Sequence, residues 1–217
     1  MQLNWHRRHL RARQTPALST AFTAAKANES RVVPLFVLDD AILSRADGLG
    51  VAFMLSSLRA LRDWYRDRGG DIVIRHGDPT DVVGHVAEAV DADRVVWNSD
   101  HSRLARGRDR AVRRDLTRIG VEYTAVGSNR QPETDTSIPS FRDAEASLAD
   151  PTALGIETGA VPRLSDLGGS AYDPAPLTAG TASASKYLRA LSNGTTYRRS
   201  DDTGTTDSPR DPVVGWV

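Results

Sequence analysis

The 217-residue chain contains no cysteine, which excludes disulfide bonds, thiol catalysis, iron–sulfur clusters and cysteine-based zinc sites. It also lacks a run of about 18 apolar residues, so a membrane-spanning helix is not expected. The 28 Lys and Arg residues balance the 28 Asp and Glu residues, which leaves no net charge to favour nucleic acid or membranes. The N-terminus has no apolar segment typical of secretion signals. These absences predict a cytoplasmic protein.

Residues 1–126 alternate between short apolar segments and longer amphipathic ones. Five segments have the composition of buried strands: Gln2–Trp5, Arg31–Leu38, Asp71–Arg75, Asp93–Trp97 and Val121–Val126. Helices are expected between them, over residues 16–26, 51–68, 79–90 and 103–119, the first with Thr15 as its N-cap. Strands joined by helical crossovers form parallel sheets. The sequence therefore predicts an α/β fold with a doubly wound, five-stranded parallel sheet of the Rossmann-like type.

The composition changes after residue 127. Eight of the 11 prolines lie in residues 128–217, and no apolar periodicity persists there. We therefore expect an α/β domain over residues 1–127, followed over residues 128–217 by a linker or poorly structured extension that cannot form its own core.

Ligands of open parallel sheets bind outside the carboxyl ends of the strands, near the point where the strand order reverses. Polar residues follow the predicted strands at these ends: Trp5–Arg8, Asp39 and Asp40, His76 and Asp78, and Asn98–His101. They predict a binding site for a polar, partly anionic or aromatic ligand.

No short motif identifies that ligand. His6, His76 and His101 lack metal-ligand spacing, so we expect no metal. Gly48–Gly50 lacks the third glycine of a dinucleotide fingerprint, and neither GxxxxGK[ST] nor GxSxG occurs. Trp5 and Trp97 are expected to be packing residues rather than a cofactor platform.

The helix over residues 103–119 is rich in arginine. Two interpretations are open: its arginines follow phosphate groups, or they form a solvated face that pairs with Asp109 within the helix, which the sequence favours. The arginines concerned are Arg103, Arg106, Arg110, Arg113 and Arg114.

Several blocks of the sequence resemble, in order, the N-terminal α/β domain of the DNA photolyase/cryptochrome family. Trp5–Arg11 followed by Pro16–Leu18 resembles that family's W-F-R-R-D-L-R…N-P-A-L signature. Val96–Asp109 (VWNSDHSRLARGRD) resembles W-N-x-D-Y…A-R-x-R-D. Arg31–Asp39, Ala52–Leu58 and Ile74–Pro79 are similar to the second strand, the F-L-x-x-S-L helix and the G-D-P turn. The similarity is collinear over about 125 residues.

The resemblance implies a flavoprotein that uses light to repair pyrimidine dimers or to sense blue light. Such proteins hold catalytic FAD in a C-terminal helical domain, which also binds damaged DNA with the dimer flipped out. The α/β domain often holds an antenna pigment. The resemblance places that pigment against residues at the strand ends and the first loop: Arg7, Arg11, Phe36, Asp39, Asn98 and Asp100. Leu104 and Ala105 replace residues that are often polar in folate-using members, so a deazaflavin or flavin is favoured over a folate.

The sequence departs from the family pattern at several places. His6 stands where Phe is usual, and His9 where Asp is usual. The family's FAD domain is longer than residues 128–217. Leu188–Asp201 resembles its beginning, with Tyr197 near the position of the first tyrosine that contacts FAD.

We therefore expect the pigment-binding α/β domain without a complete FAD domain, from a naturally short or a truncated gene. Photolyases are carbon–carbon lyases, but we expect no catalytic residue and no light-driven repair in this chain alone. Two alternatives remain: a stand-alone α/β module that binds a nucleotide or another small ligand, and a remnant without function.

Overall fold

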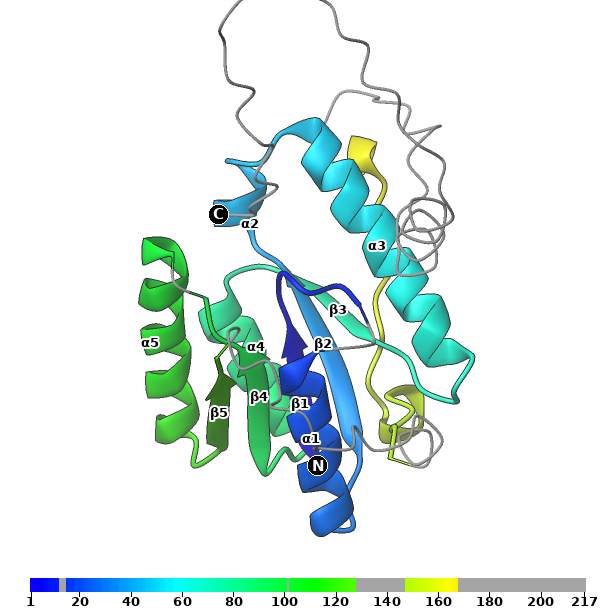
Figure 1. Ribbon diagram of the computed structural model, residues 1–217, viewed down its shortest axis with the longest axis vertical. Coiled ribbons are helices and arrows are strands. Elements are labelled where there is room, and N and C mark those ends of the chain that lie inside the picture. The colour runs from blue at the N-terminus through cyan, green and yellow to red at the C-terminus, as the bar shows by residue number, and fades with distance from the viewer. Residues whose placement is uncertain (12–14, 101, 128–146, 168–217) are drawn as a thin grey trace, which may run out of the picture.

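The computed structural model describes residues 1–11, 15–100, 102–127 and 147–167. Its centre is a parallel sheet with the strand order β3-β2-β1-β4-β5 (Figure 1). The strands are β1 (Gln2–His6), β2 (Val32–Leu38), β3 (Val73–His76), β4 (Arg94–Asn98) and β5 (Glu122–Val126). The predicted doubly wound α/β fold is confirmed. Because β1 pairs with β2 on one side and β4 on the other, the strand order reverses at β1.

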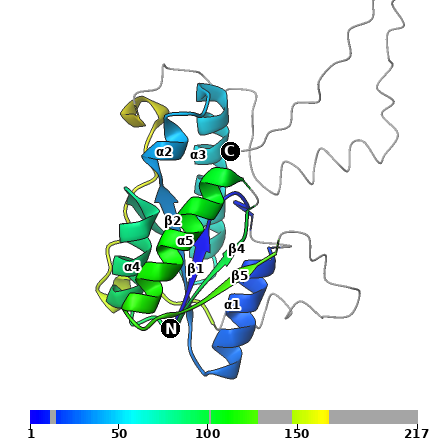
Figure 2. The ribbon, with the colours of Figure 1, turned by 90° about the vertical axis from the view of Figure 1, so that its left-hand side faces the viewer.

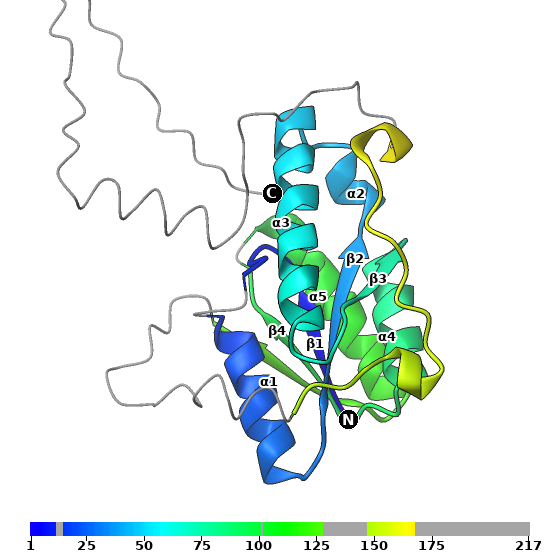
Figure 3. The ribbon, with the colours of Figure 1, turned by 90° about the vertical axis from the view of Figure 1, so that its right-hand side faces the viewer.

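Helices cover both faces of the sheet (Figure 2, Figure 3). One face packs against α1 (Pro16–Ala27) and α3 (Gly48–Arg66), and the other against α4 (Pro79–Ala89) and α5 (Arg103–Arg118). Each face has its own apolar core, since side chains alternate between the faces along each strand. The short α2 (Asp40–Leu43), which directly follows β2, was not predicted from the sequence.

Side chains placed just before the helices fix where they begin. Asp47 accepts a hydrogen bond from the Gly50 amide, so α3 begins at Gly48, three residues before the predicted start. Thr15 precedes α1 as predicted, but its hydroxyl donates to the Arg11 carbonyl. The Asn98 Oδ1 accepts from the Ala17 amide instead, so the end of β4 caps α1.

Residues 147–167, part of the predicted extension, pack on the α/β domain. Leu148 forms a bridge with Val32, and the Ile74 amide donates to the Thr158 carbonyl. This segment covers the outer edge of the sheet beside β3 and contains the 3₁₀ turns η1 (Thr152–Leu154) and η2 (Leu164–Leu167). The sequence did not indicate this packing, because the contacts join residues that lie far apart in the chain.

None of the helices in the described part of the chain has both the length and the apolar character needed to cross a membrane.

Candidate functional site: a cleft at the carboxyl ends of the strands

A cleft lies at the carboxyl ends of β1 and β2, beside the point where the strand order reverses. Its cavity volume is about 60 Å³. Its apolar wall includes Leu10, Phe36, Ile42, Leu43, Met54, Leu104 and Ala105. Polar groups come from His6, Arg7, Arg8, Asp39, Asp100 and Arg108. A mainly apolar wall with a few polar groups suits a flat organic ligand with one polar edge.

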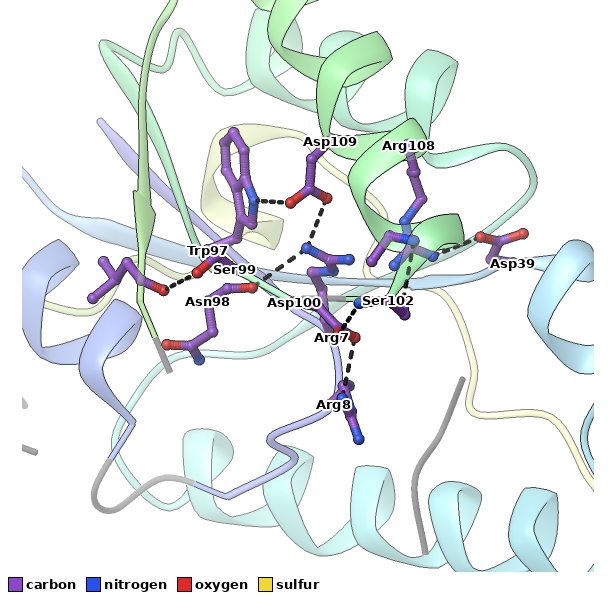
Figure 4. A network of polar contacts seen from close by, with 12 residues as sticks. Arg7, Arg8, Asp39, Trp97, Asn98, Ser99, Asp100, Ser102, Arg108 and Asp109 are labelled. Atoms are coloured by element: carbon purple, nitrogen blue, oxygen red, sulfur yellow. Dashed lines mark hydrogen bonds and ion pairs between the residues drawn. The ribbon is translucent and has the colours of Figure 1, made fainter. Parts of the chain in front are cut away.

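Two arginines of the cleft, Arg7 and Arg108, each pair with an aspartate (Figure 4). Arg7 Nη1 donates to Asp109 Oδ1 at 2.8 Å and to the Asn98 carbonyl at 3.3 Å. Arg108 Nη1 donates to Asp39 Oδ2 at 2.8 Å. Their guanidinium carbons lie 5.0 and 5.5 Å from the ring centroid of Trp5, within cation–π range. Trp5 thus lines the cleft and also packs against both cations.

These arginines have hydrogen-bond donors to spare. Nε and Nη2 of Arg7 and Nε of Arg108 are buried and have no hydrogen-bond partner among the described residues. Burial lowers the pKa of Arg7, and the neighbouring Arg108 cation lowers it further, against the opposing effect of Asp109. Buried donors without partners destabilise a protein, so a ligand that offers acceptor atoms here would be stabilised by them.

Asp100 fixes the loop that leads into α5. Its Oδ1 accepts from the Ser102 amide at 3.0 Å, and its Oδ2 lies 3.3 Å from Arg8 Nη1. Burial favours the neutral acid, but the Ser102 amide and the arginine charges outweigh it, so the pKa of Asp100 is lowered. Asp100 therefore stays charged near neutral pH.

His6 forms a buried pair with Tyr65 beneath the cleft. Its Nε2 lies 2.7 Å from the Tyr65 hydroxyl, and the rings meet edge to face. Burial lowers the pKa of His6 to about 4, so the imidazole is neutral near neutral pH. Burial also raises the pKa of Tyr65. The pair gives the cleft floor a neutral polar contact where the motif that this segment resembles has Phe.

Four of the predicted pigment contacts, Arg7, Phe36, Asp39 and Asp100, line the cleft. Asn98 lies next to it, with its side chain capping α1 and its carbonyl accepting from Arg7. Arg11 is exposed and does not line the cleft, and Tyr197 lies outside the described residues. That these residues contact a pigment remains a prediction.

Sequence reasoning missed Arg108. The sequence analysis had already placed Leu104 near the pigment. Arg108 lies four residues further along α5 and therefore on the same face of the helix, so its position at the cleft could have been inferred. Within the described ranges, no group of three or more His, Asp or Glu side chains is arranged to hold a metal ion.

Comparison with known proteins shows which family has this fold and sequence. A family model described as DNA photolyase matches residues 2–134. The chain belongs to the DNA photolyase family. The resemblance inferred from the sequence is thereby confirmed.

The related sequences include photolyases and cryptochromes. The chain is 36% identical over 231 residues to a deoxyribodipyrimidine photo-lyase of Halobacterium salinarum, with 93% of this chain and 48% of that protein covered. It is 27% identical over 192 residues to a cryptochrome DASH of Natronomonas pharaonis, covering 76% and 40% of the two chains. The chain therefore spans about half the length of these curated relatives.

Two solved structures have the same fold. An archaeal photolyase of Sulfolobus tokodaii matches with a TM-score of 0.52 and 25% identity, over 58% of this chain and 29% of that one. That structure is described as holding two FAD molecules and implying a novel light-harvesting cofactor. A class III photolyase of Agrobacterium tumefaciens matches with a TM-score of 0.64 and 21% identity, over 89% and 44% of the two chains.

Proposed function

We propose that the cleft binds a light-absorbing pigment with a flat heterocyclic ring, and that the chain contributes light harvesting to a photolyase or cryptochrome. The observation that carries this proposal is the pair of arginines, Arg7 and Arg108, each held by an aspartate beside an apolar wall. When bound, the pigment would supply absorption of visible light, and the protein would supply its orientation.

The residues of the cleft fit a flavin or a deazaflavin. Both pigments have a fused ring system with carbonyl oxygens along one edge. The rings would lie against Phe36, Met54 and Leu104, and the carbonyl oxygens would accept hydrogen bonds from Arg7 and Arg108. Asp39 and Asp109 hold the two guanidinium groups in place, so the donors are oriented before the pigment arrives.

We assign light harvesting, rather than bond cleavage, to the described residues. The reaction of the whole protein would be the light-driven repair of pyrimidine dimers in DNA, or blue-light sensing with FAD as the second cofactor. This assignment draws on the relatives named deoxyribodipyrimidine photo-lyase and cryptochrome, of which this chain covers less than half.

A nucleotide-binding module is the second candidate, because the cleft lies where doubly wound sheets commonly bind nucleotides. Titration of the purified chain separates the two. Flavin, deazaflavin, folate and adenine nucleotides are added in turn, and binding is followed by the visible difference spectrum or, for colourless ligands, by calorimetry. We expect a flavin or deazaflavin to bind, and a folate to bind more weakly.

Arg108→Gln supplies the site-specific test and Arg110→Gln the matched control, since Arg110 is exposed on the same helix. Arg108→Gln should weaken pigment binding about tenfold, because a charge-assisted hydrogen bond contributes about 1.5–3 kcal/mol. Arg110→Gln should leave it unchanged. Binding of an adenine nucleotide with no affinity for either pigment, or equal effects of the two variants, would reject the proposal.

A further inference from the structure

The arginines of α5 are not paired in the way the sequence favoured. Asp109 is 5% exposed and faces the sheet, where its Oδ1 accepts from Arg7 and its Oδ2 accepts from the Trp97 indole nitrogen. The interpretation in which Asp109 neutralises the arginines of its own helix is therefore wrong. It failed because Arg7 lies 102 positions away in the sequence, and local spacing could not show that contact.

The arginines of α5 fall into two groups. Three have partners: Arg108 pairs with Asp39, Arg118 pairs with Asp115, and Arg113 lies 5.8 and 5.7 Å over the rings of Trp97 and Tyr123. The side chains of the other four are exposed and form no hydrogen bond or ion pair with any described residue. These four, called the arginine row below, are Arg103, Arg106, Arg110 and Arg114.

Helix geometry places the arginine row on one face. Its members are three, four and four residues apart, which brings them to one side of α5, opposite the buried Ala105, Val112 and Leu116. At 1.5 Å per residue the row is about 16 Å long. In helical projection it lies between Arg113, which packs on Tyr123, and Arg118, which pairs with Asp115.

Glu88 of the neighbouring helix α4 lies close enough to Arg118 to favour its charge, and Asp115 pairs with the same arginine. Asp115 faces α4, where a side chain added at Gly84 would collide with its carboxylate. Figure 2 shows α4 and β5 on opposite sides of α5. The arginine row therefore carries four positive charges that form no ion pair with a described acidic side chain, although the whole chain has a formal net charge of zero.

We propose that the arginine row binds the sugar–phosphate backbone of a nucleic acid. Guanidinium groups match phosphate oxygens in charge and in two-pronged geometry. The four arginines along this length can each contact one phosphate group.

A nucleic acid fits this surface better than a lipid membrane. Amphipathic helices that bind membranes need large apolar side chains beside their cations, but the apolar side of α5 is packed against the sheet. This surface is also additional to the one that the family resemblance implies, since there the damaged DNA is bound by the FAD domain. It does not depend on the pigment cleft.

The salt dependence of binding tests the proposal. Fluorescence anisotropy is measured with the full chain and labelled oligonucleotides, one single-stranded and one duplex, at several salt concentrations. Four phosphate contacts predict a slope of log K against log salt of about −3 to −4, and hence an affinity loss of about 100-fold between roughly 50 and 200 mM salt. The two oligonucleotides show which nucleic-acid form is preferred.

The double variant R106Q/R110Q should reduce the steepness of that slope by about 2, because each arginine accounts for about one released counterion. The matched control R31Q/R45Q removes two exposed arginines outside α5 and should leave the slope unchanged. R108Q, which tests the pigment cleft, should also leave it unchanged. Thermal unfolding of each variant confirms that it folds.

Three outcomes would overturn the proposal. The first is that the wild-type chain does not bind either oligonucleotide at low salt. The second is that R106Q/R110Q binds with the wild-type affinity and slope. The third is that vesicles of anionic phospholipid bind the chain while the oligonucleotides do not.

Discussion

Arg62 and Arg7 are both buried arginines that pair with an aspartate, at opposite ends of the sheet. Arg62 Nε and Nη2 donate to the two oxygens of Asp71 at 2.9 and 3.0 Å, and Nη2 also donates to Thr158 at 2.8 Å. Asp71 also accepts from Arg66 and from the Ile72 amide. Arg7, in contrast, has two buried nitrogens without a partner in the described part of the chain.

The difference separates a structural network from the cleft that we propose as a binding site. The network around Asp71 is fully bonded and joins α3, the start of β3 and the segment over residues 147–167. The groups at the cleft have unpartnered donors and a histidine whose charged form is disfavoured. A complete network stabilises one conformation, whereas donors without partners leave hydrogen bonds that a ligand could supply.

The largest effect is expected at the complete network. Asp71→Ala leaves the buried Arg62 without its counter-charge and should lower the free energy of unfolding by about 3–5 kcal/mol. Asp63→Ala, which removes an exposed carboxylate from α3, should cost less than about 0.5 kcal/mol. Urea unfolding at neutral pH measures both. Similar values for the two variants would show that Asp71 is not the centre of the network.

The next effect concerns His6 and pH. The unfolded chain takes up a proton on His6 below its ordinary pKa of 6.5, but the folded chain does so only near 4, so stability falls as the pH is lowered through this range. The expected loss by pH 4 is about 3 kcal/mol. The double variant H6F/Y65F lacks the imidazole and leaves no hydroxyl unpaired.

The measurement for His6 is urea unfolding of both proteins at several pH values. The wild-type chain should lose about 3 kcal/mol more than H6F/Y65F between pH 7 and 4. His9, whose pKa is also lowered by burial and then by its arginine neighbours, is present in both proteins and cancels. Parallel pH profiles would mean that His6 is accessible to solvent protons in the folded chain.

The smallest effect is expected where Arg7 and Asp109 are replaced together. R7M/D109N removes an incompletely bonded ion pair and retains an acceptor for Trp97, so stability should stay within about 1 kcal/mol of the wild-type chain. The matching R62M/D71N should lose at least about 2 kcal/mol, since it also removes bonds to Arg66 and Thr158. Equal losses, measured by thermal unfolding, would contradict the distinction between the two ends of the sheet.

Much of the fold could be predicted from the sequence because its signals are local. Apolar segments such as Arg31–Leu38 indicate strands that are covered on both faces, and the parallel order then places Arg7, Asp39 and Asp100 at one edge of the sheet. The partners of these residues could not be predicted in this way. Arg108 meets Asp39 across 69 positions, and the Thr158 contact with Arg62 spans 96.

The strand-like contacts of residues 147–158 have a practical consequence for anyone who shortens the protein. They occupy the backbone amides of Val32 and Ile74, which a fragment ending at residue 127 would leave open along one margin of the sheet. Open margins of this kind recruit further strands, and so lead to aggregation. A fragment intended for crystallisation or spectroscopy should therefore extend at least to residue 167.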